Sequence, residues 1–267
     1  MKFESVPENF SQVDEDYCDD VNILIENEDD FHVVINVVTK FEAISGAILN
    51  RNRKSKVMGL GQWKGRTNWP LAWLKTEDQL KVFGYILKPN YKDLLSANWD
   101  ITLTNFKKVL LSWDCRALDT LQQRVHVLVV FATSTLWYKC QALPLPSKNV
   151  EKFESAIFTF LWRGKLEKLE KYETKNELKF GGLAVPCIAS KADALFVRQT
   201  CRLLNNKENN SRKHIQFWIG GLFSHLWPAL GQGPHSQIVP EYFEHLRTLI
   251  EEAVRMEVID KNNLKHT

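Results

Sequence analysis

The stretch Tyr17-Cys18-Asp19-Asp20-Val21-Asn22-Ile23-Leu24-Ile25 joins two adjacent carboxylates to an apolar run of strand-forming residues. An aspartate pair at the head of such a run is typical of a β-hairpin that presents carboxylates to a divalent metal ion. Mg²⁺ or Mn²⁺ held in this way stabilises the attacking and leaving oxygens of phosphoryl transfer. Acidic pairs are also common on solvated turns, so this pair alone is a weak indicator of catalysis.

Further along the chain, short motifs follow the aspartate pair in a fixed order. They are Phe41–Asn50, Lys54–Gly61, Lys81–Ile86, Leu118–Val125, Leu136–Tyr138, Leu143–Pro146, Phe160–Gly164, Gly181–Leu183 and Ala194–Arg198. With the aspartate pair, this series resembles the later palm motifs and the thumb of non-LTR (LINE-type) retrotransposon reverse transcriptases, over roughly residues 14–205. An ordered series is far more specific than any one of its motifs.

The resemblance implies an α+β fold in three parts. Residues 1–95 would form a partial palm of hairpin, helix and short strands, residues 96–205 a mainly α-helical thumb-like region, and residues 206–267 a C-terminal helical extension. The implied reaction is RNA-directed DNA synthesis, by a nucleotidyltransferase of a transposable element. Such a polymerase also needs fingers and a third metal-binding carboxylate. Only about a dozen residues precede the hairpin, so we expect a truncated enzyme, inactive alone.

The resemblance also assigns the catalytic residues. Asp19 and Asp20 match the family's metal-binding pair, with Asp19 on the catalytic metal and Asp20 supporting the site. Lys54 falls in the family's Lys-Ser pair, where a cation neutralises pyrophosphate or donates a proton to it. Cys18 replaces the family's usual alanine. The implied cofactor is Mg²⁺ or Mn²⁺ in an active enzyme, with no structural cofactor.

Two further sets of residues are candidates for contact with an RNA template and DNA primer duplex. Phe83-Gly84 resembles the primer grip, in which glycine permits close approach of the backbone; a simple strand with a bulge is the alternative. Lys107, Lys108 and Arg124 on thumb-like helices are placed to contact phosphates. Such contacts position a duplex without reading its sequence.

The charge is unevenly distributed. The chain has 267 residues and a net charge of +3, but residues 1–30 hold eleven acids and one base. The remaining residues hold 34 basic and 21 acidic side chains, a net charge of +13. An acidic edge on a basic body suits a protein that binds metal at one end and phosphates along the other. Without the family resemblance, the charge balance alone favours the simpler explanation, a solvated acidic N-terminus on a mildly basic protein.

Cysteine usage and hydropathy indicate an intracellular protein, cytoplasmic or nuclear. The five cysteines are scattered and none is in a Cys-x-x-Cys pair, which argues against a disulfide framework or a zinc finger. The N-terminus has no apolar signal segment. The longest apolar stretch, Val127–Ala132, is far too short to span a membrane. We expect no membrane and no obvious protein partner.

Hydrophobic spacing predicts mostly helices after the first part of the chain. The expected helices are 29–43, 104–113, 119–141, 148–162 with Ser147 as its cap, 186–204, 215–227 and 240–258. Short strands are expected over Val57–Leu60 and Gln79–Leu87, a loop over 165–179 and a linker over 207–213. Trp113, Trp137 and Trp162 are expected in the core rather than as base-stacking platforms, because of the apolar area they bury.

Two other hypotheses stay open. One is a catalytically silent nucleic-acid-binding protein derived from such an element, which salt-sensitive duplex binding without primer extension would favour. The other is a helical interaction module or an unstable relic, which poor solubility from an exposed palm face would favour.

Overall fold

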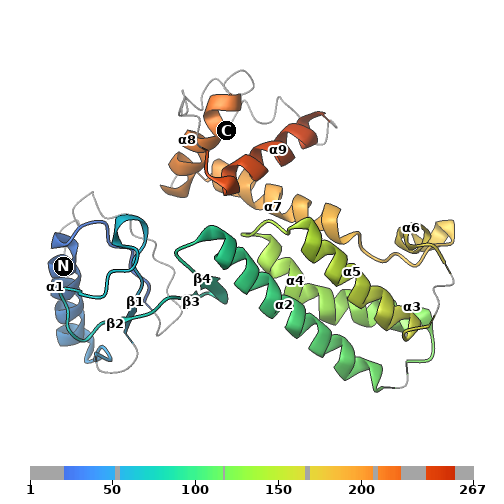
Figure 1. Ribbon diagram of the computed structural model, residues 1–267, viewed down its shortest axis with the longest axis horizontal. Helices are drawn as coiled ribbons and strands as arrows, with labels where there is room; N and C mark the ends of the chain where they lie inside the picture. The colour runs from blue at the N-terminus through green and yellow to red at the C-terminus, as the bar shows by residue number, and fades with distance from the viewer. Residues whose placement is uncertain are drawn as a thin grey trace. The chain divides into compact units, whose positions relative to one another are not determined.

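In a computed structural model the chain is mainly helical with a few short strands, an α+β protein in the broad sense (Figure 1). The structure describes residues 21–51, 55–116, 118–165, 169–206, 210–223 and 239–255. They belong to two compact units, which divide between Ala97 and Asn98. No helix in these ranges is both long and apolar enough to cross a membrane.

The first unit is built around α1 (Asp29–Ser45), which confirms the helix predicted for residues 29–43. Acidic Asp29 and Asp30 lie in its first turn, where they interact favourably with the positive end of the helix dipole. The Asp30 carboxylate also accepts the backbone N–H groups of Glu26 and Asn27. The helix ends at Gly46, whose φ of 71° is the left-handed conformation that glycine favours at a helix end.

An aromatic cluster covers the N-terminal half of α1. Phe31 is buried, and its ring centroid lies 6.3 Å from that of Trp63 and 6.2 Å from that of Trp69. The Arg66 guanidinium lies over both indoles, 5.6 Å and 5.1 Å from their centroids, and forms an ion pair with Glu28 at 2.7 Å. The small core of this unit is therefore aromatic, and the Arg66 side chain covers its two indole rings.

The strands of the first unit form two small sheets. One pairs β1 (Lys56–Val57) with β2 (Lys75–Thr76) in parallel, and the other pairs β3 (Leu80–Val82) with β4 (Tyr85–Leu87) antiparallel. The strand predicted over Val57–Leu60 was therefore wrong beyond Val57. The single strand predicted over Gln79–Leu87 was also wrong, because a two-residue turn divides it into two.

Three helical segments form the centre of the second unit (Figure 1). The first is α2 (Tyr91–Asp114), of which residues 98–114 belong to this unit. The second is a continuous helical stretch made of α3 (Leu121–Val127), the π-helical η2 (Leu128–Ala132) and α4 (Thr133–Cys140), and the third is α5 (Ser147–Trp162). The middle stretch runs antiparallel to the other two. Lys139, near its end, meets Asn98 near the start of α2, at 2.8 Å. Arg124, near its start, meets the Phe160 carbonyl near the end of α5.

The helix boundaries differ from prediction for local reasons. The helix predicted over 104–113 is much longer, because Asn90 starts it at Tyr91 by accepting the Lys92 N–H. The helix predicted over 119–141 is confirmed in its extent, and Thr120 caps it reciprocally with Gln123. Ser147 as a cap of α5 was wrong: Pro146 occupies that position and no side chain caps the helix.

Large aromatic side chains fill the space between α2 and α5. Trp99, Phe106 and Phe153 are all fully buried. The Phe153 ring meets the other two edge to face, with centroids 6.4 Å and 5.2 Å away. The Trp99 indole N–H donates to the Pro144 carbonyl at 3.0 Å. Burying each such ring stabilises the fold by roughly 1.5–3 kcal/mol. Trp113 of α2 is only partly buried, which differs from the core position expected for it.

A compact turn follows α5 where a loop was expected. Within residues 165–179 the structure places α6 (Lys171–Lys175) and the 3₁₀ turn η3 (Leu178–Phe180). Buried Thr174 anchors this region, because its carbonyl accepts the N–H groups of both Leu183 and Val185. The loop predicted over 165–179 was therefore wrong for Lys171–Lys175 and Leu178–Phe180, which are helical.

The last three helices form their own apolar cluster. They are α7 (Ile188–Asn205), which also packs against α4 and α5, α8 (Asn210–Phe223) and α9 (Glu241–Arg255). The helices predicted over 186–204, 215–227 and 240–258 are confirmed in their described parts. The linker predicted over 207–213 was wrong from Asn210 onward, because α8 begins there. Their shared core consists of Phe196, Leu204, Ile215, Ile219, Leu246 and Ile250.

Candidate nucleic-acid interface

The predicted catalytic residues Asp19, Asp20 and Lys54 lie outside the described residues. Residues 21–26, which follow the aspartates, are described and have no regular secondary structure. Their apolar side chains are largely exposed, with Val21 at 68% and Leu24 at 53%. Within the described ranges, no three His, Cys, Asp or Glu side chains are grouped closely enough to hold a metal ion.

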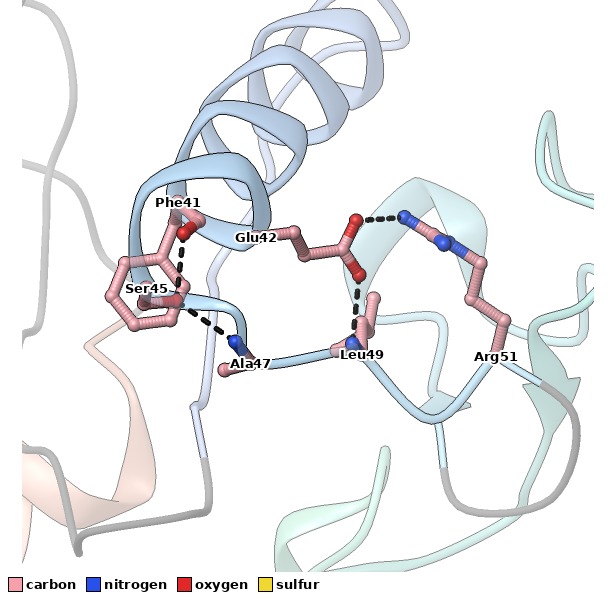
Figure 2. Close-up of polar contacts among 6 residues, drawn as sticks. All are labelled: Phe41, Glu42, Ser45, Ala47, Leu49 and Arg51. Atoms are coloured by element: carbon pink, nitrogen blue, oxygen red, sulfur yellow. Dashed lines mark hydrogen bonds and ion pairs between the residues drawn. The ribbon is translucent and has the colours of Figure 1, made fainter.

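The turn before Lys54 is held by Glu42 (Figure 2). Its carboxylate accepts the Leu49 backbone N–H at 2.7 Å and binds the Arg51 guanidinium at 2.5 Å. The Leu49 hydrogen bond, with help from Arg51, holds the pKa of the Glu42 carboxyl below its usual value. The Ser45 hydroxyl donates to the Phe41 carbonyl. This turn coincides with the segment 41–50 that resembles the family motif.

Phe83 and Gly84 form the tip of a tight hairpin rather than part of a strand. Val82 pairs with Tyr85, and the two residues between them have φ values of 47° and 79°. Positive φ at both positions is the geometry of the two-residue turns that suit twisted hairpins. Gly84 is thus required by the turn itself, and Phe83 takes a conformation that side-chain-bearing residues rarely adopt.

Arg124 lies inside the protein, contrary to the expectation that it contacts phosphates. Its side chain is only 4% exposed. The guanidinium donates to the Phe160 carbonyl at 2.5 Å and to the Leu118 carbonyl at 3.4 Å, and lies 3.5 Å from the Asp114 carboxylate. It therefore joins the end of α2, the start of α3 and the last turn of α5. We assign Arg124 a structural role, since a duplex has no access to it in this arrangement.

Lys107 and Lys108 lie on the exposed side of α2. Within the described part of the chain, neither forms an ion pair with a carboxylate. Lys107 also lines a groove of about 660 Å³ between α2 and α5. The other residues that line it are Leu110, Leu111, Asp114, Glu151, Lys152, Ser155, Ala156, Thr159, Phe160, Arg163 and Gly164.

The groove has an apolar floor and charged margins. Lys152 of α5 and Lys107 of α2 both line it, and exposed Lys148 lies one turn before Lys152 on the same helix. At the opposite end Arg163 lines the groove and donates to the Leu118 carbonyl at 2.9 Å. This end is the C-terminal end of both helices, where partial negative charge disfavours an anion. The lysine end is therefore the better site for phosphate.

Sequence reasoning identified the lysines of α2 but missed those of α5. The missing signal was the spacing of Lys148 and Lys152, four residues apart and opposite the apolar positions of a predicted helix. That α2 and α5 lie parallel, with Lys107 and Lys152 lining one groove, required the tertiary structure. Arg124 and Lys107 look equivalent in sequence, and only burial distinguishes them.

Comparison with known proteins gives no match: no protein-family model matches this chain, and no curated protein matches it.

Proposed function

We propose that the helical unit binds the phosphate backbone of nucleic-acid duplexes, in a chain related to the reverse transcriptases of non-LTR retrotransposons. The observation that carries this proposal is that Lys107 of α2 and Lys152 of α5 line one groove, with exposed Lys108 next to Lys107 in the chain. Three cations on two rigid helices suit a regular array of phosphates. Contacts of this kind fix position and orientation without sequence preference.

The motif order in the sequence supports the family relationship. Its thumb-like segments, Leu118–Val125 and Phe160–Gly164, coincide with the contacts that join α3 to α5 through Arg124. An arginine that a nucleic acid cannot reach still has a reason to be retained there, because it connects three helices. In this proposal the thumb-like role belongs to the lysine-bearing face.

Fluorescence anisotropy with an RNA–DNA duplex at several salt concentrations tests the binding. Each phosphate contact contributes about 1 to the slope of log affinity against log salt. We expect Lys107→Ala/Lys108→Ala/Lys152→Ala to lower the magnitude of this slope by about 2–3. The control is Arg202→Ala/Lys213→Ala/Arg255→Ala, which removes the same charge from exposed positions on α7, α8 and α9. If the two triple variants lower the salt slope equally, the loss reflects net charge rather than contacts at these lysines, and the proposal is overturned.

A second candidate is RNA-directed DNA synthesis itself, favoured by the aspartate pair in its motif series. The test is primer extension on a primed RNA template with dNTPs and Mg²⁺ or Mn²⁺. Templated extension that disappears in Asp19→Ala would establish a polymerase. Duplex binding without extension would leave backbone binding as the function of this chain.

A further inference from the structure

A partly buried cysteine at the start of α7 lies among polar side chains from three helices. The Ser190 hydroxyl, in the first turn of α7, donates to the Cys187 Sγ at 3.3 Å. The Lys175 ammonium, at the end of α6, lies 4.0 Å from the same sulfur. It also donates to the Glu154 carboxylate of α5 at 2.7 Å. A hydroxyl and a cation from two different helices therefore approach one sulfur.

Backbone hydrogen bonds hold this lysine close to this cysteine. The carbonyl of buried Thr174 accepts the N–H groups of Leu183 and Val185 at 3.2 and 3.1 Å. Lys175 directly follows Thr174 in the chain, and Cys187 follows Val185 after one proline. The two side chains thus project from backbone segments that are bonded to each other, and their approach is built into the fold.

The surroundings of Cys187 favour its thiolate form. Desolvation raises the pKa of the thiol, but hydrogen bonding to Ser190 and the charge of Lys175 outweigh this, so the pKa is lowered. Desolvation also lowers the pKa of the Lys175 ammonium, but the hydrogen bond to Glu154 raises it by more, so Lys175 stays cationic. Cys187 occupies the N-cap position of α7, a helix of 18 residues, where the helix dipole favours negative charge.

The other cysteines that the structure describes have different surroundings. The exposed Cys115 thiol donates to the Ser112 carbonyl at 3.2 Å, a bond that only a protonated thiol can form. Burial raises the pKa of the Cys140 thiol to about 12 and also raises that of Cys201. Reactive cysteines are partly exposed and lie near cationic groups, whereas buried ones are inert. Cys187 has the features of the reactive kind.

We infer that Cys187 is a site of oxidation to sulfenic acid by hydrogen peroxide, with Lys175 and Ser190 as positioning residues. The thiolate sulfur attacks one peroxide oxygen and the O–O bond breaks, which gives the sulfenic acid and hydroxide. The sulfur loses two electrons, the peroxide gains them, and the hydroxide takes a proton from solvent to become water. The Lys175 ammonium beside the sulfur stabilises the negative charge that develops on the leaving oxygen. This oxidation does not depend on nucleic-acid binding.

The pH dependence of alkylation in the whole native chain is the first test. Iodoacetamide rates for each cysteine over a range of pH, measured by peptide mass spectrometry, give two quantities. The midpoint reports formation of the thiolate, and the plateau reports access to the sulfur. We expect the midpoint of Cys187 to lie below that of the exposed Cys115. With limiting hydrogen peroxide at neutral pH, dimedone should trap sulfenic acid at Cys187 in preference to Cys115.

Substitutions test the two positioning residues. Lys175→Gln should slow alkylation of Cys187 at neutral pH roughly 1.5- to 5-fold, the range for one partly exposed charge, and should raise its midpoint. Lys175→Arg, which keeps the charge, should restore both, and Ser190→Ala should also raise the midpoint. Lys179→Gln is the matched control, because it removes the same charge from the nearby η3 turn, where Lys179 pairs with Glu177.

The native chain alone can overturn the inference, so no variant has to fold for the result to count. A Cys187 midpoint at or above that of Cys115 would do so, as would the absence of a dimedone adduct at Cys187. Equal effects of Lys175→Gln and Lys179→Gln on Cys187 would overturn the role of Lys175. Thermal melts of each variant show that the fold is retained.

Discussion

The two units differ in how completely their helices are covered. In the second unit α2, α4 and α5 each bury large apolar side chains completely, among them Trp99, Leu136 and Phe153, although Leu111 of α2 is 69% exposed. In the first unit α1 buries only Phe31 fully, while Val37, Phe41 and Ile44 are 54%, 60% and 85% exposed. Because helices gain most of their stability from packing of an apolar face, the second unit has what it needs to fold alone and α1 does not.

The units also differ in charge density. Residues 31–97 hold 11 basic and 4 acidic side chains, and residues 98–267 hold 23 basic and 17 acidic ones. Residues 31–97 are thus the more basic stretch for their length, although the first unit as a whole, with residues 1–30, holds 12 basic and 15 acidic side chains. Some of that charge is balanced locally, since Lys56 and Lys75 share Glu77 at 3.6 and 3.0 Å. The second unit has a lower net positive charge for its length than residues 31–97, but much of its charge lies on helices.

The largest expected effect is in the aromatic core. Phe153→Ala removes a fully buried ring and leaves a cavity, so we expect unfolding free energy to fall by about 3–5 kcal/mol. Phe41→Ala changes an exposed side chain of α1 and should alter stability by no more than about 0.5 kcal/mol. Urea denaturation followed by circular dichroism measures both. Similar losses in the two variants would break the contrast between the units.

Cysteine labelling tests the packing of the second unit in another way. Burial, with a smaller contribution from Asp193, raises the pKa of the Cys140 thiol to about 12. For Cys187, desolvation is outweighed by hydrogen bonds from Ser190 and the charge of Lys175, so its pKa is lowered. Since the thiolate reacts, iodoacetamide at pH 8 should label Cys187 at least about 100-fold faster than Cys140. Peptide mass spectrometry gives both rates; equal rates would mean that this unit opens readily.

The structural role of Arg124 predicts a stability loss without a binding loss. Arg124→Ala removes the short hydrogen bond to the buried Phe160 carbonyl, which keeps only the Arg163 backbone N–H at 3.5 Å, and we expect this to cost about 1–3 kcal/mol. The slope of duplex affinity against salt should match that of the native chain at a temperature where both are folded. A slope lowered by about 1 would restore Arg124 as a phosphate contact and contradict its assignment.

The smallest effect is expected in the turn after α1. Because the pKa of Glu42 is lowered in the folded chain, its contribution is present above the unfolded value of 4.5 and is lost as pH falls through the folded value. Glu42→Gln should therefore reduce hydrogen-exchange protection of the Leu49 amide at pH 6 and leave the second unit unchanged. Arg51→Lys, which keeps the charge, is the milder control. Unchanged Leu49 protection in Glu42→Gln would show that this turn is held by other contacts.

Helices were predictable from sequence where apolar spacing was regular. The segments around Phe31 and Phe153 have such spacing, and both are helical as expected. Strands were less predictable, because Phe83-Gly84 forms a turn whose positive φ at Phe83 has no sequence signature. The start of α2 was missed because the Asn90 cap lies far before the first clear helical repeat.

The sequence predicted only part of the candidate site, namely the lysines of α2. The adjacent Lys107 and Lys108 indicate an exposed helix face in the sequence. In contrast, no local sequence pattern distinguishes a buried arginine that donates to carbonyl groups, such as Arg124, from an exposed arginine that binds phosphate. The groove between α2 and α5 brings Lys152 opposite Lys107, although they are far apart in the chain. Cys187 likewise obtains its cationic neighbour only through the tertiary structure.

The central claim is that the helical unit carries both a stable fold and the nucleic-acid binding. The direct measurement is duplex binding by a fragment of residues 88–255, which keeps the Asn90 cap of α2, compared with the whole chain over a range of salt. We predict that the fragment melts cooperatively and binds duplex, and that Lys107→Ala/Lys108→Ala/Lys152→Ala weakens it. A fragment that folds but does not bind would contradict the claim and transfer binding to the basic stretch of residues 31–87.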